Sequence, residues 1–162
     1  MGAAQTFDAL MGELDYSMFI VTAAADGRRE GCLVGFAGQT SIDPPRFLVC
    51  LSEKNRTTRL AAKADHLAVH FVPASAEVLA ELFGGTTGDE EDKFARCAWQ
   101  PGPEGLPILD ECENWFVGRV LERVDLGDHI GHLLEPEAAH HGATGPEFSF
   151  HRAKRIDPGH EA

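Results

Sequence analysis

The stretch GFAGQTSIDPP, residues 35–45, carries the most information about the architecture of this 162-residue chain. It continues an apolar run, GCLV (31–34), yet it contains two glycines and several polar residues and stops at a double proline. A glycine inside a strand marks a bulge, or a place where a ligand or another backbone comes close. Gly35 and Gly38 frame such a place. A barrel corner also needs glycine, so a corner and a ligand-facing surface are both open interpretations.

The segments around this stretch favour β-structure. SMFIVTAA (17–24) is rich in β-favouring residues, and the Asp-Gly signal at the start of DGRRE (26–30) predicts a hairpin turn. The returning strand is expected to run through the whole of 31–41. Further strands are expected at RFLVCLS (46–52), at HLAVHFV (66–72), on both sides of the turn DLGD (125–128) and at EFSFHRAKRI (147–156).

Three short helices are expected between these strands. Residues 55–64 predict a helix with Asn55 as its N-cap, and residues 75–83 predict another. An N-terminal amphipathic helix of about three turns, expected to pack on the rest of the chain, follows from apolar residues at helical spacing: Phe7, Leu10, Met11 and Leu14.

The segment 84–109 follows neither period. Glycine, proline and acidic residues dominate it, so we expect a long surface excursion anchored by Phe94, Cys97 and Trp99. Strands dominate the remainder and show no βαβ rhythm, which predicts a small antiparallel barrel with helical additions. We expect one domain over residues 1–162, with a core at about 15–135.

Composition excludes several partners. With 14 basic and 26 acidic residues the formal charge is −12, which repels nucleic acid and an anionic membrane surface. No apolar run reaches the roughly 20 residues needed to span a bilayer, and the N-terminus lacks the pattern of a signal peptide. We therefore expect a cytoplasmic protein whose four cysteines are reduced.

A candidate anion site lies where LSEKNRTTRLAA (51–62) passes from a strand into a helix. The first turn of a helix offers unpaired N–H groups, and basic and hydroxyl side chains add donors there. The residues that contribute are Lys54, Asn55, Arg56, Thr57 and Thr58. Ordinary helix capping would use the same residue types, so a phosphate site and a simple cap are both open.

Three segments in this order resemble the flavin reductase-like proteins of the FMN-binding split-barrel superfamily. They are GCLVGFAGQTSIDPPRFLVCLS (31–52), with its S-x-D-P-P signal, NRTTRLAAKADHLAVHFV (55–72) and GDH (127–129). The resemblance covers about Asp15 to Glu135. It implies a mainly β fold, namely a six-stranded antiparallel split β-barrel of Greek-key type with short flanking α-helices.

The resemblance also implies a homodimer that holds FMN in a groove near the subunit interface. The residues expected under the flavin ring and ribityl chain are Val34, Gly35, Phe36, Ala37, Gly38, Gln39 and Thr40. The residues expected towards the phosphate are Ser41, Lys54, Asn55, Arg56, Thr57 and Thr58. The strand would then lack bulk because a planar ring lies against it.

Two features bear on how the cofactor is used. Leu33, Gly35, Ala37 and Gly38 stand where many relatives carry Thr or Ser. Each neutral hydrogen bond is worth about 1 kcal/mol, so FMN is expected to exchange, with FAD or riboflavin as alternative ligands. His129 resembles the family histidine near flavin and nicotinamide, which implies an orienting catalytic role; a solvated turn histidine is the alternative.

The resulting hypothesis is a flavin-dependent oxidoreductase that transfers hydride from NAD(P)H to FMN and can supply a partner oxygenase. The alternatives are a non-catalytic flavin-binding module and a ligand-free dimeric interaction domain. No G-x-S-x-G elbow or dinucleotide-type glycine pattern is present. The eight histidines lack the Cys or carboxylate spacing of a tetrahedral set, so no metal site is expected.

Overall fold

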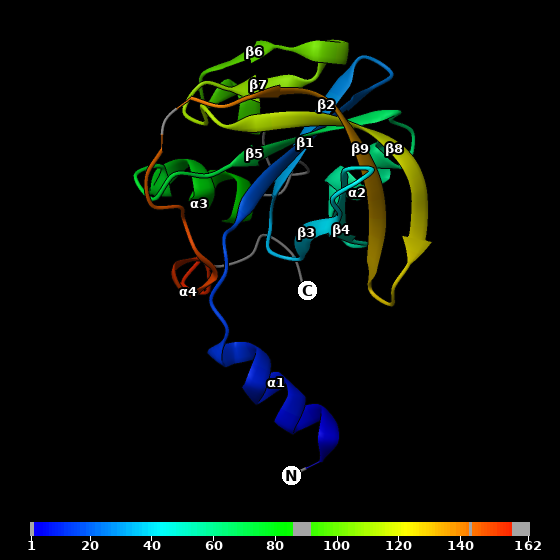
Figure 1. Cartoon of the computed structure of the whole chain (residues 1–162). Coiled ribbons are helices and arrows are strands. Elements are labelled where there is room, and N and C mark those ends of the chain that lie inside the picture. The colour runs from blue at the N-terminus through cyan, green and yellow to red at the C-terminus, as the bar shows by residue number, and fades with distance from the viewer. Residues whose placement is uncertain (1, 86–91, 143, 157–162) are drawn as a thin grey trace.

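A seven-stranded antiparallel sheet forms the body of the protein in the computed structural model, which describes residues 2–85, 92–142 and 144–156 (Figure 1). The strand order is β2-β1-β5-β8-β9-β4-β3. In chain order these strands are β1 (Phe19–Ala25), β2 (Arg28–Val34), β3 (Ala37–Ser41), β4 (Arg46–Ser52), β5 (His66–Phe71), β8 (Trp115–Asp125) and β9 (His129–His140). The two edge strands, β2 and β3, are consecutive in the chain, so the sheet curls until its edges meet at residues 35 and 36.

The stretch expected as one strand, 31–41, is divided at this joint. Up to Val34 the chain pairs with β1, whereas from Ala37 it pairs with β4. The Cys50 N–H donates a hydrogen bond to the Phe36 carbonyl at 2.8 Å, which fixes the change of partner. The sheet therefore has seven strands rather than the six expected.

The inside of the curled sheet is filled by apolar side chains from alternate strand positions. On β1, Phe19, Val21 and Ala23 point inward, whereas Ile20 packs on the outer face. Both faces of β1 are buried, which accounts for its nearly unbroken apolar sequence. Helix α2 (Arg56–Ala61) contributes Leu60 and Ala61 to this inner core.

A second apolar layer covers the outer face of β1. It includes helix α3 (Glu77–Gly85), with Phe83 almost fully buried, and the buried side chains of Phe94 and Leu109. Strands β6 (Trp99–Pro101) and β7 (Pro107–Leu109) pair with each other, and two 3-10 turns flank β6, at Lys93–Ala95 and Pro103–Gly105. The described part of the expected excursion is thus an anchored cover rather than a loose loop. Phe94 is confirmed as an anchor, while 86–91 fall outside the described residues.

The C-terminal segment does not form the strand expected at 147–156. Only two isolated bridges occur, Ser17 with Ser149 and Pro73 with Glu147, and the chain then turns into α4 (Phe150–Ala153). Phe148 is fully buried between them, and its N–H and carbonyl bond to the backbone of Val72 and Met18. The buried side chain and backbone hydrogen bonds of Phe148 therefore hold this segment, which does not form a continuous strand.

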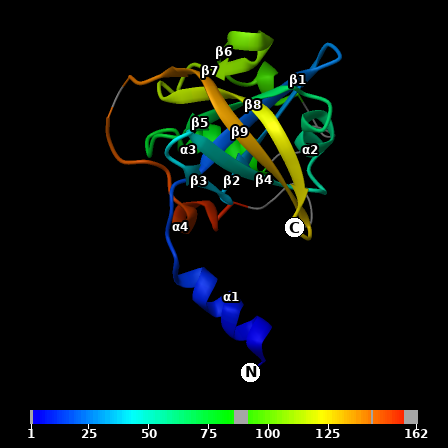
Figure 2. The ribbon, with the colours of Figure 1, turned by 45° about the vertical axis from the view of Figure 1, so that its right-hand side comes forward.

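Helix α1 (Ala3–Glu13) forms as predicted but does not pack on the rest of the chain. It has no buried residue, and Figures 1 and 2 show it standing away from the body. Its apolar residues Phe7 and Leu10 are 58% and 53% exposed. Within the described residues, no helix is both long and apolar enough to cross a membrane.

The β8–β9 hairpin turns at the predicted DLGD segment. Gly127 has φ +117°, a left-handed conformation that favours glycine, and its N–H donates to the Asp125 carboxylate at 3.1 Å. The Glu53 N–H donates to the Asp128 carbonyl at 3.0 Å, so the turn is joined to the loop that precedes α2. This contact brings His129 beside the joint between β2 and β3.

Candidate functional site

A cavity of about 240 Å³ opens where β2 gives way to β3. Its wall includes Val34, Gly35 and Phe36 from the joint, with Cys50 and Ser52 from β4. Asn55, before α2, and His129, at the start of β9, also line it. Segments far apart in the sequence therefore meet at this cavity.

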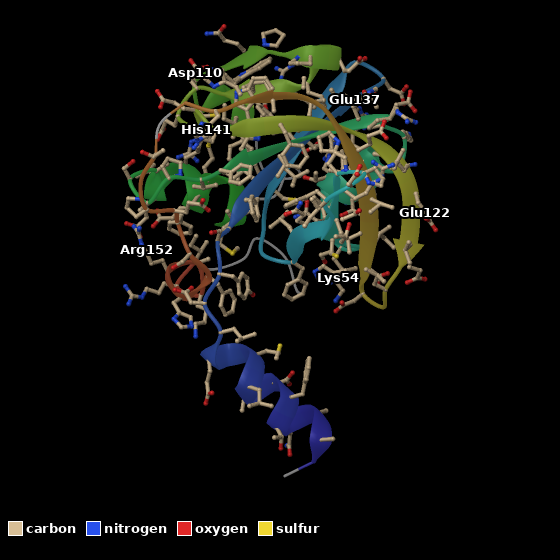
Figure 3. All side chains as sticks on the ribbon, in the orientation of Figure 1. Lys54, Asp110, Glu122, Glu137, His141 and Arg152 are labelled. Carbon is tan, nitrogen blue, oxygen red and sulfur yellow. The ribbon has the colours of Figure 1, made fainter. Side chains whose placement is uncertain are left out.

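The cavity gathers part of the residue set predicted from the sequence: Val34, Gly35, Phe36, Asn55 and His129. The remaining strand residues continue along β3 at the sheet edge, beyond the cavity wall: Ala37, Gly38, Gln39, Thr40 and Ser41. Lys54, Arg56, Thr57 and Thr58 surround the start of α2 and likewise lie outside the wall. Figure 3 labels Lys54 beside the β8–β9 hairpin.

Gly35 and Gly38, the two glycines of residues 35–45, have different surroundings. A Cβ on Gly35 would lie 3.1 Å from the Met18 sulfur and 3.1 Å from the Tyr16 ring, so close packing within the chain already favours glycine there. A Cβ on Gly38 would meet nothing within 4 Å. Only Gly38 leaves open space in front of the sheet, where a planar ligand could lie.

The threonines at the start of α2 are engaged within the chain. The Thr57 N–H donates to the Asn55 side-chain oxygen at 2.9 Å, which makes Asn55 the N-cap that the sequence predicted. The Thr58 hydroxyl donates to the Ser52 carbonyl. Both threonines are buried. Their position favours the capping interpretation for Thr57 and Thr58, while Asn55 borders the cavity.

Arg56 is positioned by an ion pair. Its Nε lies 2.9 Å from a carboxylate oxygen of Glu30, whose side chain is only 14% exposed. Partial burial strengthens such a pair relative to one in open water. The pair directs Arg56 along the side of β2, away from the cavity wall.

His129 stands over the cavity mouth next to Phe36. The two ring centroids are 4.9 Å apart, and the His129 Nδ1 lies 2.7 Å from a carboxylate oxygen of Asp128. This hydrogen bond lowers the pKa of Asp128. A proton on Nδ1 satisfies the carboxylate and leaves Nε2 as the ring atom that can accept a hydrogen bond.

Sequence reasoning missed the other walls of the cavity. Tyr16 and Phe150 stack with centroids 4.7 Å apart and close one side. Cys32 and Cys50 add thiols, and burial raises the pKa of both, so they are protonated at neutral pH. Phe150 was hidden because its segment was expected to be a strand. The two cysteines carried no signal beyond their apolar surroundings.

Two histidines of β5 are committed to structural bonds. His66 Nε2 lies 2.6 Å from the Glu137 carboxylate. His70 is fully buried; its Nδ1 is 2.9 Å from the Ile20 carbonyl, and its Nε2 accepts from the Leu109 N–H at 3.1 Å. Burial lowers the pKa of His70 to about 4. Among the described residues, no three His, Cys, Asp or Glu side chains come together as metal ligands would.

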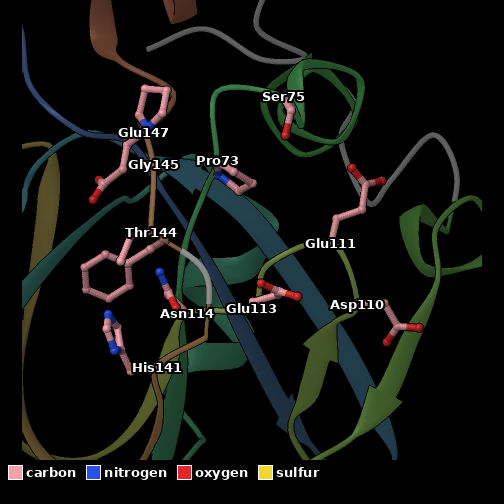
Figure 4. A pocket seen from close by; sticks show the side chains of 12 residues that line it. Pro73, Ser75, Asp110, Glu111, Glu113, Asn114, His141, Thr144, Gly145 and Glu147 are labelled. Atoms are coloured by element: carbon pink, nitrogen blue, oxygen red, sulfur yellow. The ribbon is translucent and has the colours of Figure 1, made fainter.

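A second hollow, of about 530 Å³, lies on another part of the surface (Figure 4). Four carboxylates line it, together with His141 and Asn114: Asp110, Glu111, Glu113 and Glu147. This charge disfavours phosphate-bearing ligands. None of the site residues predicted from the sequence lines it.

Comparison with known proteins gives a consistent result. The family described as flavin reductase like domain matches residues 11–156. FMN reductase (NADH) RutF of Escherichia coli is 31% identical over 140 residues, which cover 86% of this chain and 85% of that protein.

Solved structures show the same fold. The flavin reductase domain protein of an Arthrobacter species aligns with a TM-score of 0.83 and 22% identity, over 92% of this chain and 91% of that chain. Nitrilotriacetate monooxygenase component B of Mycobacterium thermoresistibile aligns with a TM-score of 0.80 and 22% identity, over 98% and 92%. At these identities the structures establish the fold alone.

Proposed function

The chain belongs to the flavin reductase like family, and we propose that it is an NAD(P)H-dependent FMN reductase. The observation that carries the proposal is the cavity at the β2–β3 joint, where Val34–Phe36, Asn55 and His129 converge. The curated relative of Escherichia coli bears the name FMN reductase (NADH), which supports FMN as flavin and NADH as donor.

The lining of the cavity suits a flavin. Aromatic rings, thiols and backbone groups form its walls, and they can enclose a planar heteroaromatic ring. The volume of about 240 Å³ is smaller than the 300 Å³ or more typical of sites that enclose a whole drug-sized ligand. The ring system would therefore occupy the cavity while the ribityl phosphate lies outside, towards Asn55 and Lys54.

FMN, when bound, supplies the redox chemistry by accepting a hydride from the nicotinamide. The chain's own residues hold and orient the two rings. Phe36 and His129 form the exposed side of the cavity, and Asp128 fixes the ring of His129. The Nε2 of His129 can then accept a hydrogen bond from the nicotinamide carboxamide, which orients that ring without a catalytic proton transfer.

The reaction is tested by colour and by anaerobic reduction. Purified protein mixed with FMN should lose the flavin absorption on addition of NADH or NADPH, at a rate that rises with protein concentration. Protein that binds FMN but leaves it oxidised would instead be a flavin-binding module. Protein whose thermal unfolding is unmoved by FMN would be a ligand-free interaction domain.

The phosphate contact is tested at Asn55. Asp caps a helix as well as Asn does, so Asn55→Asp keeps the hydrogen bond to the Thr57 N–H but adds a negative charge. We expect FMN to bind at least about tenfold more weakly, because that charge repels the phosphate, and riboflavin to bind within about twofold of the wild-type protein. Equal losses for both ligands would place the phosphate elsewhere.

A homodimer is the assembly we propose. The support is α1, whose apolar face has no partner within the described residues of its own chain. An isolated helix of eleven residues is marginal in water, so a second copy that covers this face would stabilise it. The neighbour named as a monooxygenase component supports a further proposal, that reduced flavin passes to a partner oxygenase.

Further proposals concern the barrel type, the domain organisation, the location of the protein and the exchange of FMN. Counting β2 and β3 as one interrupted strand gives six strands, which supports a six-stranded split barrel of Greek-key type. We propose that residues 1–162 form one domain around it. The free cysteines support a cytoplasmic location. The scarcity of hydroxyl side chains around the cavity supports an FMN that exchanges, with FAD and riboflavin as alternative ligands.

A further inference from the structure

A basic cleft lies between the β1–β2 hairpin and α2. Figure 1 shows where these two elements lie. The volume of the cleft is about 580 Å³. Two carboxylates, Asp26 and Glu30, and the apolar side chain of Leu60 form part of its wall. The rest is cationic: Arg28, Arg56, Arg59 and Lys63.

This accumulation of positive charge contrasts with the rest of the chain. Four of the fourteen basic residues line the cleft, but only two of the twenty-six acidic residues do. The whole chain carries a formal charge of −12, so the cleft is a local reversal of sign. Arg56 pairs with Glu30 at 2.9 Å and Lys63 with Asp26 at 3.8 Å, so the wall keeps a net positive charge, and a concave surface of net positive charge concentrates anions.

Two of the cations lie on α2 and a third follows it. Arg56 and Arg59 are three residues apart, a spacing that brings side chains to the same side of a helix, and Lys63 lies just beyond the end of α2. The backbone positions of Arg56 and Arg59 are thus displaced by roughly 4.5 Å along the axis. Arginine binds phosphate oxygens in bidentate fashion, so this row suits more than one phosphate in succession.

The cleft and the cavity at the β2–β3 joint are lined by neighbouring residues of the same two elements. Arg28 and Glu30 alternate on β2 with the same period as Cys32 and Val34, so the first pair lines the cleft and the second pair lines the cavity. At the start of α2, Asn55 borders the cavity and its neighbour Arg56 borders the cleft. A ligand that extends from the cavity past Asn55 would therefore meet Arg56 next.

We propose that the basic cleft is a diphosphate-binding subsite, which holds the diphosphate of a dinucleotide whose ring occupies the cavity. The proposal rests on the proposed function. Two dinucleotides share this chemistry: FAD, with its flavin in the cavity, and NADH, with its nicotinamide against a bound flavin. FMN and riboflavin lack the diphosphate and serve as internal comparisons.

The test uses the double variant Arg28→Gln/Arg59→Gln, in which the cleft loses two charges while Arg56 and its bond to Glu30 stay. The matched control is Arg119→Gln/Arg155→Gln, which removes the same charge outside the cleft. Dissociation constants for FAD, FMN and riboflavin are measured by flavin fluorescence, and thermal unfolding verifies that each variant is folded.

If the flavin supplies the diphosphate, the cleft variant should bind FAD about tenfold more weakly, while FMN and riboflavin change by less than about twofold. If the nicotinamide supplies it, flavin binding should stay unchanged in all three cases. The KM for NADH should then rise about tenfold, with no rise for reduced nicotinamide mononucleotide, which lacks the diphosphate.

Equal losses of FAD and FMN, the same losses in the control variant, or no change with any ligand would overturn the proposal. Each of these outcomes leaves the reductase itself intact. Failure of the proposed function has a different signature, because wild-type protein would then neither bind riboflavin and FMN nor reduce them.

Discussion

His70 and His129 have contrasting environments in this fold. His70, in the outer layer, is fully buried, and both ring nitrogens are bonded to the backbone of other strands. His129, at the cavity, is bonded through one nitrogen to its neighbour Asp128, and its side chain is 22% exposed. The ring of His70 connects β5 to the backbone of β1 and β7, whereas the ring of His129 lines the cavity.

The contrast teaches that burial with both nitrogens satisfied removes a histidine from chemistry, even where another histidine of the same fold lines a cavity. The Leu109 N–H can donate to His70 Nε2 only while that nitrogen is unprotonated. His70 is therefore held neutral, whereas His129 keeps a nitrogen for a partner from outside the chain.

The largest expected effect comes from His70→Ala. The change removes a buried ring and leaves the Leu109 N–H without an acceptor in a dry interior, so we expect the free energy of unfolding to fall by about 4 kcal/mol. Urea denaturation followed by far-UV circular dichroism measures it.

The companion variant is His129→Ala, which should change stability by less than about 0.5 kcal/mol. It should instead lower kcat/KM for the nicotinamide donor by about tenfold, a loss typical of one neutral hydrogen bond. If the two variants destabilise the protein equally, the distinction between the two regions is wrong.

Lowering the pH of the wild-type protein should also test whether the fold requires His70 to be neutral. Burial lowers the pKa of His70 to about 4 from an ordinary value of 6.5. The unfolded chain therefore binds the proton more readily, so stability is complete above about pH 6.5 and is lost as the pH falls towards 4. The loss over this window is about 3 kcal/mol.

The reference for this pH profile is His70→Gln, which cannot titrate. Its stability should fall less steeply between pH 6.5 and 4. Burial also lowers the pKa of His132, so some slope should remain in the variant. Identical slopes in the two proteins would show that His70 does not govern the acid response.

The smallest expected effects come from substitutions at Gly35 and Gly38, which should differ from each other. Gly35→Ala should cost about 1 kcal/mol of stability, since the added Cβ would crowd Met18 and Tyr16. Gly38→Val meets open space and should leave stability within about 0.5 kcal/mol, yet weaken FMN by about tenfold if the flavin extends from the cavity over β3. Unchanged FMN affinity in the folded Gly38 variant would remove β3 from the flavin site.

Features fixed by short-range chemistry were predictable from the sequence. The Asn55 cap, the Gly127 turn and the helical N-terminal segment all depend on residues within a few positions, and all three are confirmed. Local hydrogen bonds and backbone preferences decide such features almost independently of the fold.

Features that depend on distant partners were not predictable. At the break between β2 and β3, Gly35 lies against Met18 and Tyr16, which are about twenty residues earlier, and its neighbours in the sequence do not indicate this contact. The inward insertion of Phe148 turned an expected strand into two bridges and a helix. The role of Phe150 in the cavity wall followed from the same event. Periodicity alone does not report which distant side chain occupies a gap.

The cavity can form only after β4 has paired with β9. Ser52 lies opposite His129, so a long loop must close before these strands meet, and such pairings form slowly during folding. Until they form, the walls contributed by Cys50 and His129 are apart and no flavin can be held. Ligand binding is therefore a reporter of completed folding, and added flavin should shift the refolding yield rather than the early collapse.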